Sequence, residues 1–211
     1  MFKVDKINDL DNYILPFSFN ALEPLIKGDT VQQHYEGHLL IYIERIKKLL
    51  IEFPVFQNLS LKDIILRSYG DFETTIVYYI ASQIYSHILC FESLRPYNCS
   101  ENSLMSNNLI DLIESSYTSI ENFKQQFFTK AINLFGNGWL WIVLDVNNKI
   151  VIMTTMSAFN PLNLDSVAKV LACVDLWEHA YYLQFLHKRK EYLDNIWLLI
   201  NWKYISEQLL V

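Results

Sequence analysis

The stretch "DLWEHAYY", from Asp175 to Tyr182, places an acid, a histidine and three large aromatic side chains within eight residues. A carboxylate buried among apolar groups is costly unless it is paired, hydrogen-bonded or bound to a metal. Because this stretch is so apolar, we expect Asp175 to have such a partner, and His179 lies one helical turn away. Two ordinary interpretations stay open: Asp175 as the N-cap of a helix beginning near Trp177, and Glu178 as a solvated charge in its first turn.

The composition limits the classes of protein to which the chain can belong. It has 211 residues, with 17 basic and 23 acidic side chains and a net charge of −6. This length suffices for one large domain or two small ones. Broad nucleic-acid binding needs a basic face, so we expect no nucleic-acid partner. The first residues lack the apolar core of a secretory signal, and no stretch reaches membrane-spanning length without polar interruption. We therefore expect no membrane partner and a cytoplasmic location.

The cysteines fit a reducing compartment. There are three, Cys90, Cys99 and Cys173, so at least one is unpaired. Cys90 and Cys173 lie in apolar runs, which favours buried and inert thiols.

The first half of the chain is predicted to be helical. In "VQQHYEGHLLIYIERIKKLLIE", residues 31–52, apolar side chains recur at steps of four, three and four from Leu39 to Leu50, which is one helical stripe. Asp29 or Thr30 is the expected N-cap. A second long helix is expected from about residue 71 to residue 94, where Arg95-Pro96 ends it.

In the second half of the chain, the periodicity of the apolar residues changes from a helical pattern to one typical of β-strands. A polar linker at 97–107 precedes expected helices near 109–116 and 120–134, and the β-rich runs "GWLWIVLD", "KIVIMTT" and "VAKVLACVD" then predict three strands. Helical stretches are expected again at 177–186 and about 192–209. The predicted fold class is α+β: an N-terminal antiparallel helical hairpin domain, residues 1–100, followed by a C-terminal domain of helices around a three-stranded antiparallel sheet, residues 101–211. Of the two tryptophans on the first predicted strand, Trp139 and Trp141, one is expected in the core and the other at the surface.

The chain contains five histidines. His34, His38 and Tyr42 share a helix face at i, i+4 and i+8, and His87 lies one turn beyond Gln83. A single histidine on an apolar face is usually a hydrogen-bonded core residue, and an HxxxH pair is frequent by chance. Three imidazoles and one carboxylate together would suit a first-row metal ion, whose charge would compensate for burying Asp175.

Several motifs, in this order, resemble the iron/manganese superoxide dismutase family: "HYEGHLLIY", "ASQIYSHILCFESLRP", "FGNGWLWIVLD", "MSAFNPL" and "VDLWEHAYYLQF". The resemblance extends from about Tyr13 to Leu209. It implies conversion of superoxide to dioxygen and hydrogen peroxide by alternating reduction and oxidation of a mononuclear iron, one per subunit. It also implies a homodimer.

The resemblance assigns residue roles as well. The implied metal ligands are His34, His87, Asp175 and His179. Gln83 would donate a hydrogen bond to the metal-bound solvent, Tyr42 and His38 would line the access channel, and Trp139 and Trp177 would form apolar walls. Glu178 and Tyr182 would face the partner subunit.

The resemblance also bears on the choice of metal, through the position of the active-site glutamine. Iron-type members of the family carry it on the second helix, where this chain has Gln83; manganese-type members carry it after the middle strands, where this chain has Ala158. The resemblance therefore favours iron, with manganese as the other option.

The chain also departs from the family pattern. The departures are Gly37, Leu39, Tyr85, Cys90, Phe91 and Leu186. Gly37 and Leu186 replace basic residues, which predicts a slower or more salt-sensitive enzyme unless Lys188, Arg189 and Lys190 compensate; those three can equally be a solvated face. Cys90 is a candidate oxidation target if it is exposed. The alternative function is a non-catalytic metal-binding or interaction homologue with little turnover.

Overall fold

The computed structural model describes residues 7–99 and 103–210. The helices are α1 (Gly28–His34), α2 (Leu40–Glu52), α3 (Leu61–Ser68), α4 (Thr75–Glu92), α5 (Asn107–Tyr117), α6 (Ile120–Asn133), α7 (Tyr182–Phe185), α8 (Arg189–Leu199) and α9 (Trp202–Gln208). The strands are β1 (Gly138–Asp145), β2 (Ile150–Met156) and β3 (Val167–Asp175). The α+β class is confirmed. The predicted boundary between residues 100 and 101 lies outside the described residues.

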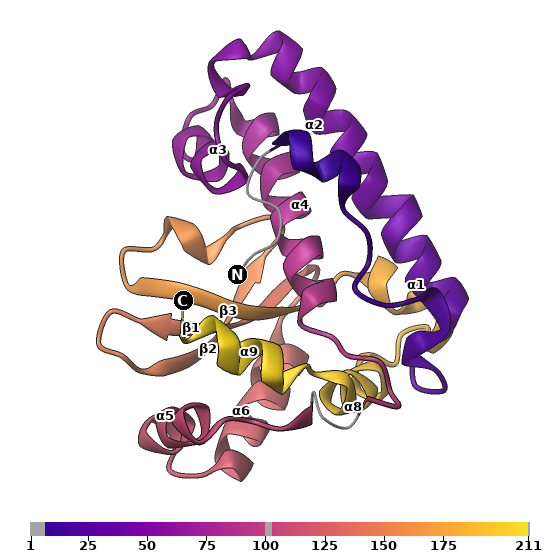
Figure 1. Ribbon diagram of the computed structural model, residues 1–211, viewed down its shortest axis with the longest axis vertical. Helices are drawn as coiled ribbons and strands as arrows, with labels where there is room; N and C mark the ends of the chain where they lie inside the picture. The colour runs from indigo at the N-terminus through magenta and orange to yellow at the C-terminus, as the bar shows by residue number, and fades with distance from the viewer. Residues whose placement is uncertain (1–6, 100–102, 211) are drawn as a thin grey trace.

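The N-terminal half is an antiparallel helical hairpin. Helices α1 and α2 run one after the other along α4, which enters the middle of the molecule (Figure 1). The predicted apolar stripe from Leu39 to Leu50 is buried. Helix α4 is buried almost all round from Val77 to Glu92, as expected for the central helix of a domain.

A wide turn of π-helix, Tyr35–Leu39, joins α1 to α2. The sequence predicted one uninterrupted helix here. A π turn adds a residue to the helical repeat and is often found at functional sites. It is bounded by His34 on one side and includes His38, so it sets the relative directions of these two side chains.

The helices of the N-terminal half differ from the predictions in three further places. Helix α1 begins at Gly28 and its N-cap is Lys27, so the prediction of Asp29 or Thr30 was wrong. The reason is local: the Glu23 carboxylate accepts the Gly28 N–H at 3.0 Å, which lets the helix begin earlier. Helix α4 begins at Thr75 rather than near residue 71. Helix α3 was not predicted.

The C-terminal sheet is antiparallel in the order β2-β1-β3. Trp139 on the central strand is paired with Thr155 of β2 and Asp175 of β3. At the outer edge of β2, the Ser116 and Tyr117 hydroxyls at the end of α5 accept the backbone N–H groups of residues 150 and 152, so side chains cover part of this edge. Helices α5 and α6 lie beside the sheet at the end remote from the hairpin (Figure 1).

Trp139 and Trp141 are both fully buried, so the prediction of one core and one surface residue was wrong. Residues two apart on a strand point to the same face, and that face packs on α4. The Trp139 ring lies 5.0 Å from that of His87. The Trp141 Nε1–H donates to Thr155 Oγ1 at 2.8 Å.

The segment after β3 is less helical than predicted. Residues 177–186 contain a 3-10 turn, Glu178–Ala180, and the single-turn helix α7. The predicted helix at 192–209 is two helices, α8 and α9, with a break at Ile200, because the Asn201 N–H donates to the Ser93 carbonyl instead of continuing the helix.

A substitution at Gly138, at the start of β1, tests how closely β1 and β2 approach each other. A Cβ at this position would overlap the backbone oxygen of Thr155 on the paired strand. Gly138→Ala is therefore expected to lower the free energy of unfolding by about 3 kcal/mol, since backbone must move to relieve the overlap. Gly37→Ala is the control, because its Cβ meets only the flexible Gln33 side chain at 3.4 Å. Urea titration of both variants measures the difference, and equal midpoints would contradict it.

Candidate metal centre

Four side chains from four segments converge between the two halves of the chain. His34 is the last residue of α1, His87 lies on α4, Asp175 is the last residue of β3, and His179 lies in the following 3-10 turn. One potential ligand atom from each lies within 4.8 Å of the other three. The resemblance had assigned these four residues to one ion, and the fold brings them together.

The separations of the donor atoms fit a single ion. Asp175 Oδ2 lies 3.0 Å from His34 Nε2, 3.1 Å from His179 Nε2 and 3.7 Å from His87 Nε2. The His87 and His179 Nε2 atoms are 3.3 Å apart. Donors about 2.1 Å from one ion lie about 3.0–3.6 Å apart when they subtend 90–120°. The donor set and its size thus suit a first-row metal.

The two oxygens of Asp175 have different partners. Oδ2 faces the imidazoles, while Oδ1 accepts the backbone N–H of Trp177 at 2.7 Å. The N-cap interpretation of Asp175 was wrong, because the N-cap of the following 3-10 turn is Trp177. The Asp175 carboxylate instead accepts the Trp177 N–H with one oxygen and faces the histidines with the other. The Tyr192 hydroxyl donates to the backbone oxygen of Asp175 at 3.0 Å. Sequence reasoning missed this contact, for which the residue spacing gives no signal.

Electrostatics keep the donors in the ionisation states that a metal needs. Burial opposes ionisation of Asp175, but His179 and His34 outweigh it, and the carboxyl pKa lies well below its usual range. Burial lowers the pKa of His87 well below 6.5, and the neighbouring His34 lowers it further. Burial also lowers the pKa of His34, against the effect of its hydrogen bond with Asp175. Neutral imidazoles and an ionised carboxylate are metal-binding forms.

The tautomer of His87 is set by the helix that carries it. Its Nδ1 lies 2.7 Å from the backbone oxygen of Gln83, an acceptor, so Nδ1 carries the proton and donates. The lone pair is left on Nε2, which points to the cluster. Hydrogen bonds of this kind orient metal-ligating histidines.

The residues assigned to the surroundings of the ion also lie here. The His38 ring stacks on His179 with centroids 3.8 Å apart, and the Tyr42 ring is 5.5 Å from His87. Burial and then His179 lower the pKa of His38 to about 4. Burial and then Asp175 raise the pKa of Tyr42, against the opposing effect of Arg45. Trp177 stacks on the outer side of His179 with centroids 5.8 Å apart.

The wall of the site contains polar atoms that have no protein partner within residues 7–99 and 103–210. They are Gln83 Oε1, Trp139 Nε1 and Trp177 Nε1. Buried polar groups are normally hydrogen-bonded, so such atoms call for explanation by solvent or a ligand. An amide and two indoles next to a metal-binding cluster fit that explanation.

The segment that carries Ala158 is held against α4. The Tyr78 hydroxyl accepts the Asn160 N–H and donates to Asn163 Oδ1, each at 3.1 Å. Ala158 is buried and offers no amide, whereas Gln83 offers one from α4. The arrangement matches the sequence expectation for the source of the glutamine.

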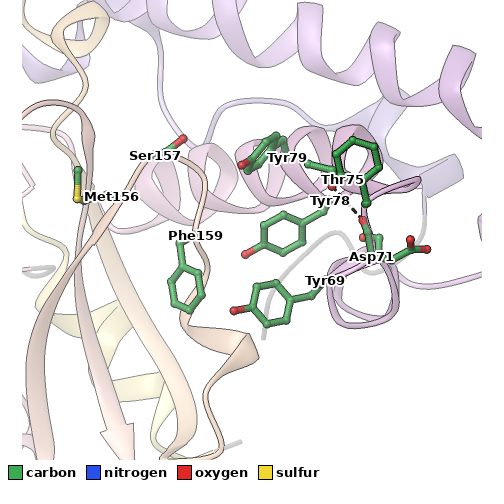
Figure 2. Close-up of a pocket in the computed structure, with 11 residues that line it drawn as sticks. Tyr69, Asp71, Thr75, Tyr78, Tyr79, Met156, Ser157 and Phe159 are labelled. Atoms are coloured by element: carbon green, nitrogen blue, oxygen red, sulfur yellow. Dashed lines mark hydrogen bonds between the residues drawn. The ribbon is translucent and has the colours of Figure 1, made fainter.

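An aromatic groove of about 380 Å³ opens elsewhere, between the α3–α4 connection and the segment after β2. Figure 2 shows the rings of Tyr69, Tyr78 and Phe159 gathered along it. None of the five histidines lines this groove. Its size therefore does not make it the site of the chemistry.

Two family models match the chain. One, for the alpha-hairpin domain of iron/manganese superoxide dismutases, matches residues 11–95, and one for their C-terminal domain matches residues 105–208. The chain belongs to the iron/manganese superoxide dismutase family. Similar proteins are named "Superoxide dismutase [Fe]" in Salmonella typhimurium (34% identical, 92% of this chain and 95% of that protein), Bordetella pertussis (34%, 92% and 95%) and Photobacterium leiognathi (35%, 92% and 96%).

Two expectations about departures from the superoxide dismutase family are corrected by the structure. Arg189 is not part of a solvated face: its guanidinium donates to the carbonyls of Leu134, Gly136 and Leu176. Cys90 is 2% exposed, so it is not accessible to oxidants at the protein surface, contrary to the exposed position that was considered. Burial of Cys90 and Cys173 agrees with the expectation of buried thiols.

Of the helices described between residues 7 and 210, none combines the length and apolarity that a membrane crossing requires.

Proposed function

We propose that this chain is a superoxide dismutase that uses one iron ion per subunit, held by His34, His87, Asp175 and His179. The observation that carries the proposal is the convergence of three imidazole nitrogens and one carboxylate oxygen on a single point. Family membership and relatives named for iron support the choice of metal. Manganese is the alternative ion for the same donors.

The reaction joins two superoxide anions and two protons to give dioxygen and hydrogen peroxide. A bound redox-active iron supplies the uptake and release of one electron. The protein residues do the rest. Asp175 would supply a fixed negative charge, which favours the higher oxidation state of a bound ion. The Gln83 amide would donate to a solvent ligand. Tyr42 is the proposed proton donor, since its pKa is raised and it stays protonated at neutral pH.

The channel walls exclude bulk water. Trp139 is fully buried beside His87, and Trp177 covers His179. His38 would line the access route from the outside, because it is half-buried and stacks on His179. Desolvation strengthens electrostatic interactions within such a site.

The test is to purify the protein, measure iron and manganese per subunit, and assay dismutation. One iron per subunit with activity is the expected result. Metal without turnover would support the non-catalytic alternative, and absence of both metal and activity would refute the proposal.

We also propose a cytoplasmic homodimer. Glu178 and Tyr182 are exposed next to the metal ligand His179, and Tyr182 is 46% exposed, as an interface residue would be in an isolated protomer. All three cysteines are free thiols, which fits a reducing compartment.

The proposed interface gives a direct prediction. Tyr182→Glu adds a carboxylate beside Glu178 and is expected to shift the protein from dimer to monomer in sedimentation velocity runs, because like charges would face each other across a two-fold axis. Tyr97→Glu is the matched control, since Tyr97 is 42% exposed on the segment after α4. An unchanged dimer in the first variant would place the interface elsewhere.

Ionic strength is expected to affect the rate. Superoxide is an anion and the chain has a net charge of −6. Arg189 is occupied by carbonyls, and Lys188 and Lys190 pair with Glu191 and Asp194. Salt shortens the Debye length from about 30 Å at 0.01 M to about 8 Å at 0.15 M. The rate constant should therefore rise over this range as the repulsion is screened.

A second variant, Arg45→Gln, removes a cation that acts on Tyr42. The rise of the rate constant with salt should be steeper in this variant than in the wild type. Pulse radiolysis at a series of salt concentrations gives the rate constants. A steep fall with salt would show that local positive charge attracts the substrate instead.

A further inference from the structure

Two buried thiols lie next to the metal-binding cluster and have no part in the proposed reaction. Cys90 is on α4, one turn beyond His87, and Cys173 is on β3, two residues before Asp175. They are 2% and 1% exposed. Neither is a ligand of the cluster.

The two thiols belong to α4 and β3, which pack on each other. Cys173 Sγ donates to the Ser86 carbonyl at 3.1 Å, and the Cys173 N–H donates to Ser93 Oγ at 3.3 Å. Cys90 lies between these two serines at helical spacing, four residues after one and three before the other, on the same face of α4. Burial raises the pKa of the Cys173 thiol, and the neighbouring Cys90 side chain raises it further.

Cys90 also lines a small cavity behind the cluster. The cavity is about 20 Å³ and is bounded by His34, Phe91, Thr30 and Tyr192. About 10–15 Å³ suffices for one water molecule. Thr30 Oγ1 is buried and has no partner among the described residues, so the cavity has a polar group to offer a small hydroxylic molecule. His34 and Cys90 both line this cavity.

We propose that Cys90 and Cys173 form a peroxide-sensitive dithiol that closes to an intrachain disulfide. The inference draws on the proposed function for its oxidant, since hydrogen peroxide is the product formed beside these residues. Cys90 Sγ attacks one peroxide oxygen, the O–O bond breaks, and the thiol proton leaves with the other oxygen as water. The product is a sulfenic acid on Cys90.

The second step uses the neighbouring thiol. Cys173 Sγ attacks the Cys90 sulfur, the S–O bond breaks, and the departing hydroxide takes the Cys173 proton to form a second water. The two thiols have then lost two electrons and two protons, and one peroxide has become two waters. The new bond ties α4, which carries Gln83 and His87, to β3, which carries Asp175. Cellular thiols would reverse it by exchange.

The experiment treats the purified iron-loaded protein with hydrogen peroxide, alkylates the remaining thiols and maps the peptides by mass spectrometry. Wild-type protein is expected to fall from three free thiols to one, and Cys99→Ser from two to none. Both should contain a Cys90–Cys173 peptide lighter by two hydrogens that dithiothreitol separates. Cys173→Ser should give no such peptide.

Two results would overturn the proposal. One is that Cys90 and Cys173 stay free in Cys99→Ser after peroxide treatment. The other is that each is oxidised to its own sulfinic acid with no linked peptide. If Cys173→Ser does not fold, the Cys99→Ser variant decides alone, because it retains both thiols. Added peroxide needs no turnover, so failure here and failure of the dismutation assay are separate results.

Discussion

His87→Ala is expected to yield a folded protein that retains less than about a tenth of the iron of the wild type and has no measurable dismutation. His87 is the ligand whose tautomer is fixed by its own helix, and it is fully buried between Trp139 and the other imidazoles. Even loss of a group that only orients a ligand weakens metal binding 10–100-fold, so loss of a ligand should cost at least as much. Elemental analysis after purification measures the iron.

The matched control is His187→Ala. His187 is exposed on the segment before α8 and lies outside the cluster. It should keep full iron and full activity. A cavity left by the first substitution lowers stability, so circular dichroism must show that the variant is folded. A full complement of iron in folded His87→Ala would contradict the assigned ligand set.

Asp175→Asn is expected to have an equally large effect by removing charge alone. An asparagine can still accept the Trp177 N–H through its side-chain oxygen, so the turn after β3 should be kept. The anion that three imidazoles face is lost. We expect iron binding to weaken at least 100-fold, with little change in secondary structure. Competition with a chelator of known affinity measures it.

The same variant gives a second readout in the metal-free protein. The pKa of Asp175 is depressed in the folded state, so its carboxylate stabilises the fold above the unfolded value of about 3.9, and this contribution is lost as the pH falls below it. Asp175→Asn should therefore show a flatter fall of the melting temperature below about pH 5. A fall as steep as that of the wild type would mean that the carboxylate is not stabilised by its histidine neighbours.

Regular, periodic parts of the fold could be predicted from the sequence. The apolar stripe from Leu39 to Leu50 predicted a helix, and the run "GWLWIVLD" predicted a strand. Both predictions were possible because the spacing of the apolar residues depends directly on which side chains the element buries. Helix α3 was missed although Ser60 caps it by accepting the Asp63 N–H at 3.0 Å. A serine followed three residues later by an acid is a capping signal, and it was available in the sequence.

Features that depend on tertiary contacts could not be predicted. The π turn at Tyr35–Leu39 leaves the apolar stripe of α2 intact, so the pattern contains no trace of it. Arg189 lies in a charged run typical of a solvated face, and only the fold brings three carbonyls to its guanidinium. The ligand set came from specific motifs, whereas the division of the Asp175 carboxylate between Trp177 and the imidazoles required the structure.

The donors of the metal centre come from distant parts of the chain, since His34 and Asp175 are 141 residues apart. Bringing the ends of so long a segment together costs roughly 4 kcal/mol of chain entropy, from (3/2)RT ln n. In the folded protein, the free energy of folding has already offset this entropy before an ion binds. A denatured chain would have to bear it during metal capture, so it should compete poorly for iron, and the ion should shift the folding equilibrium toward the native state in proportion to its free concentration.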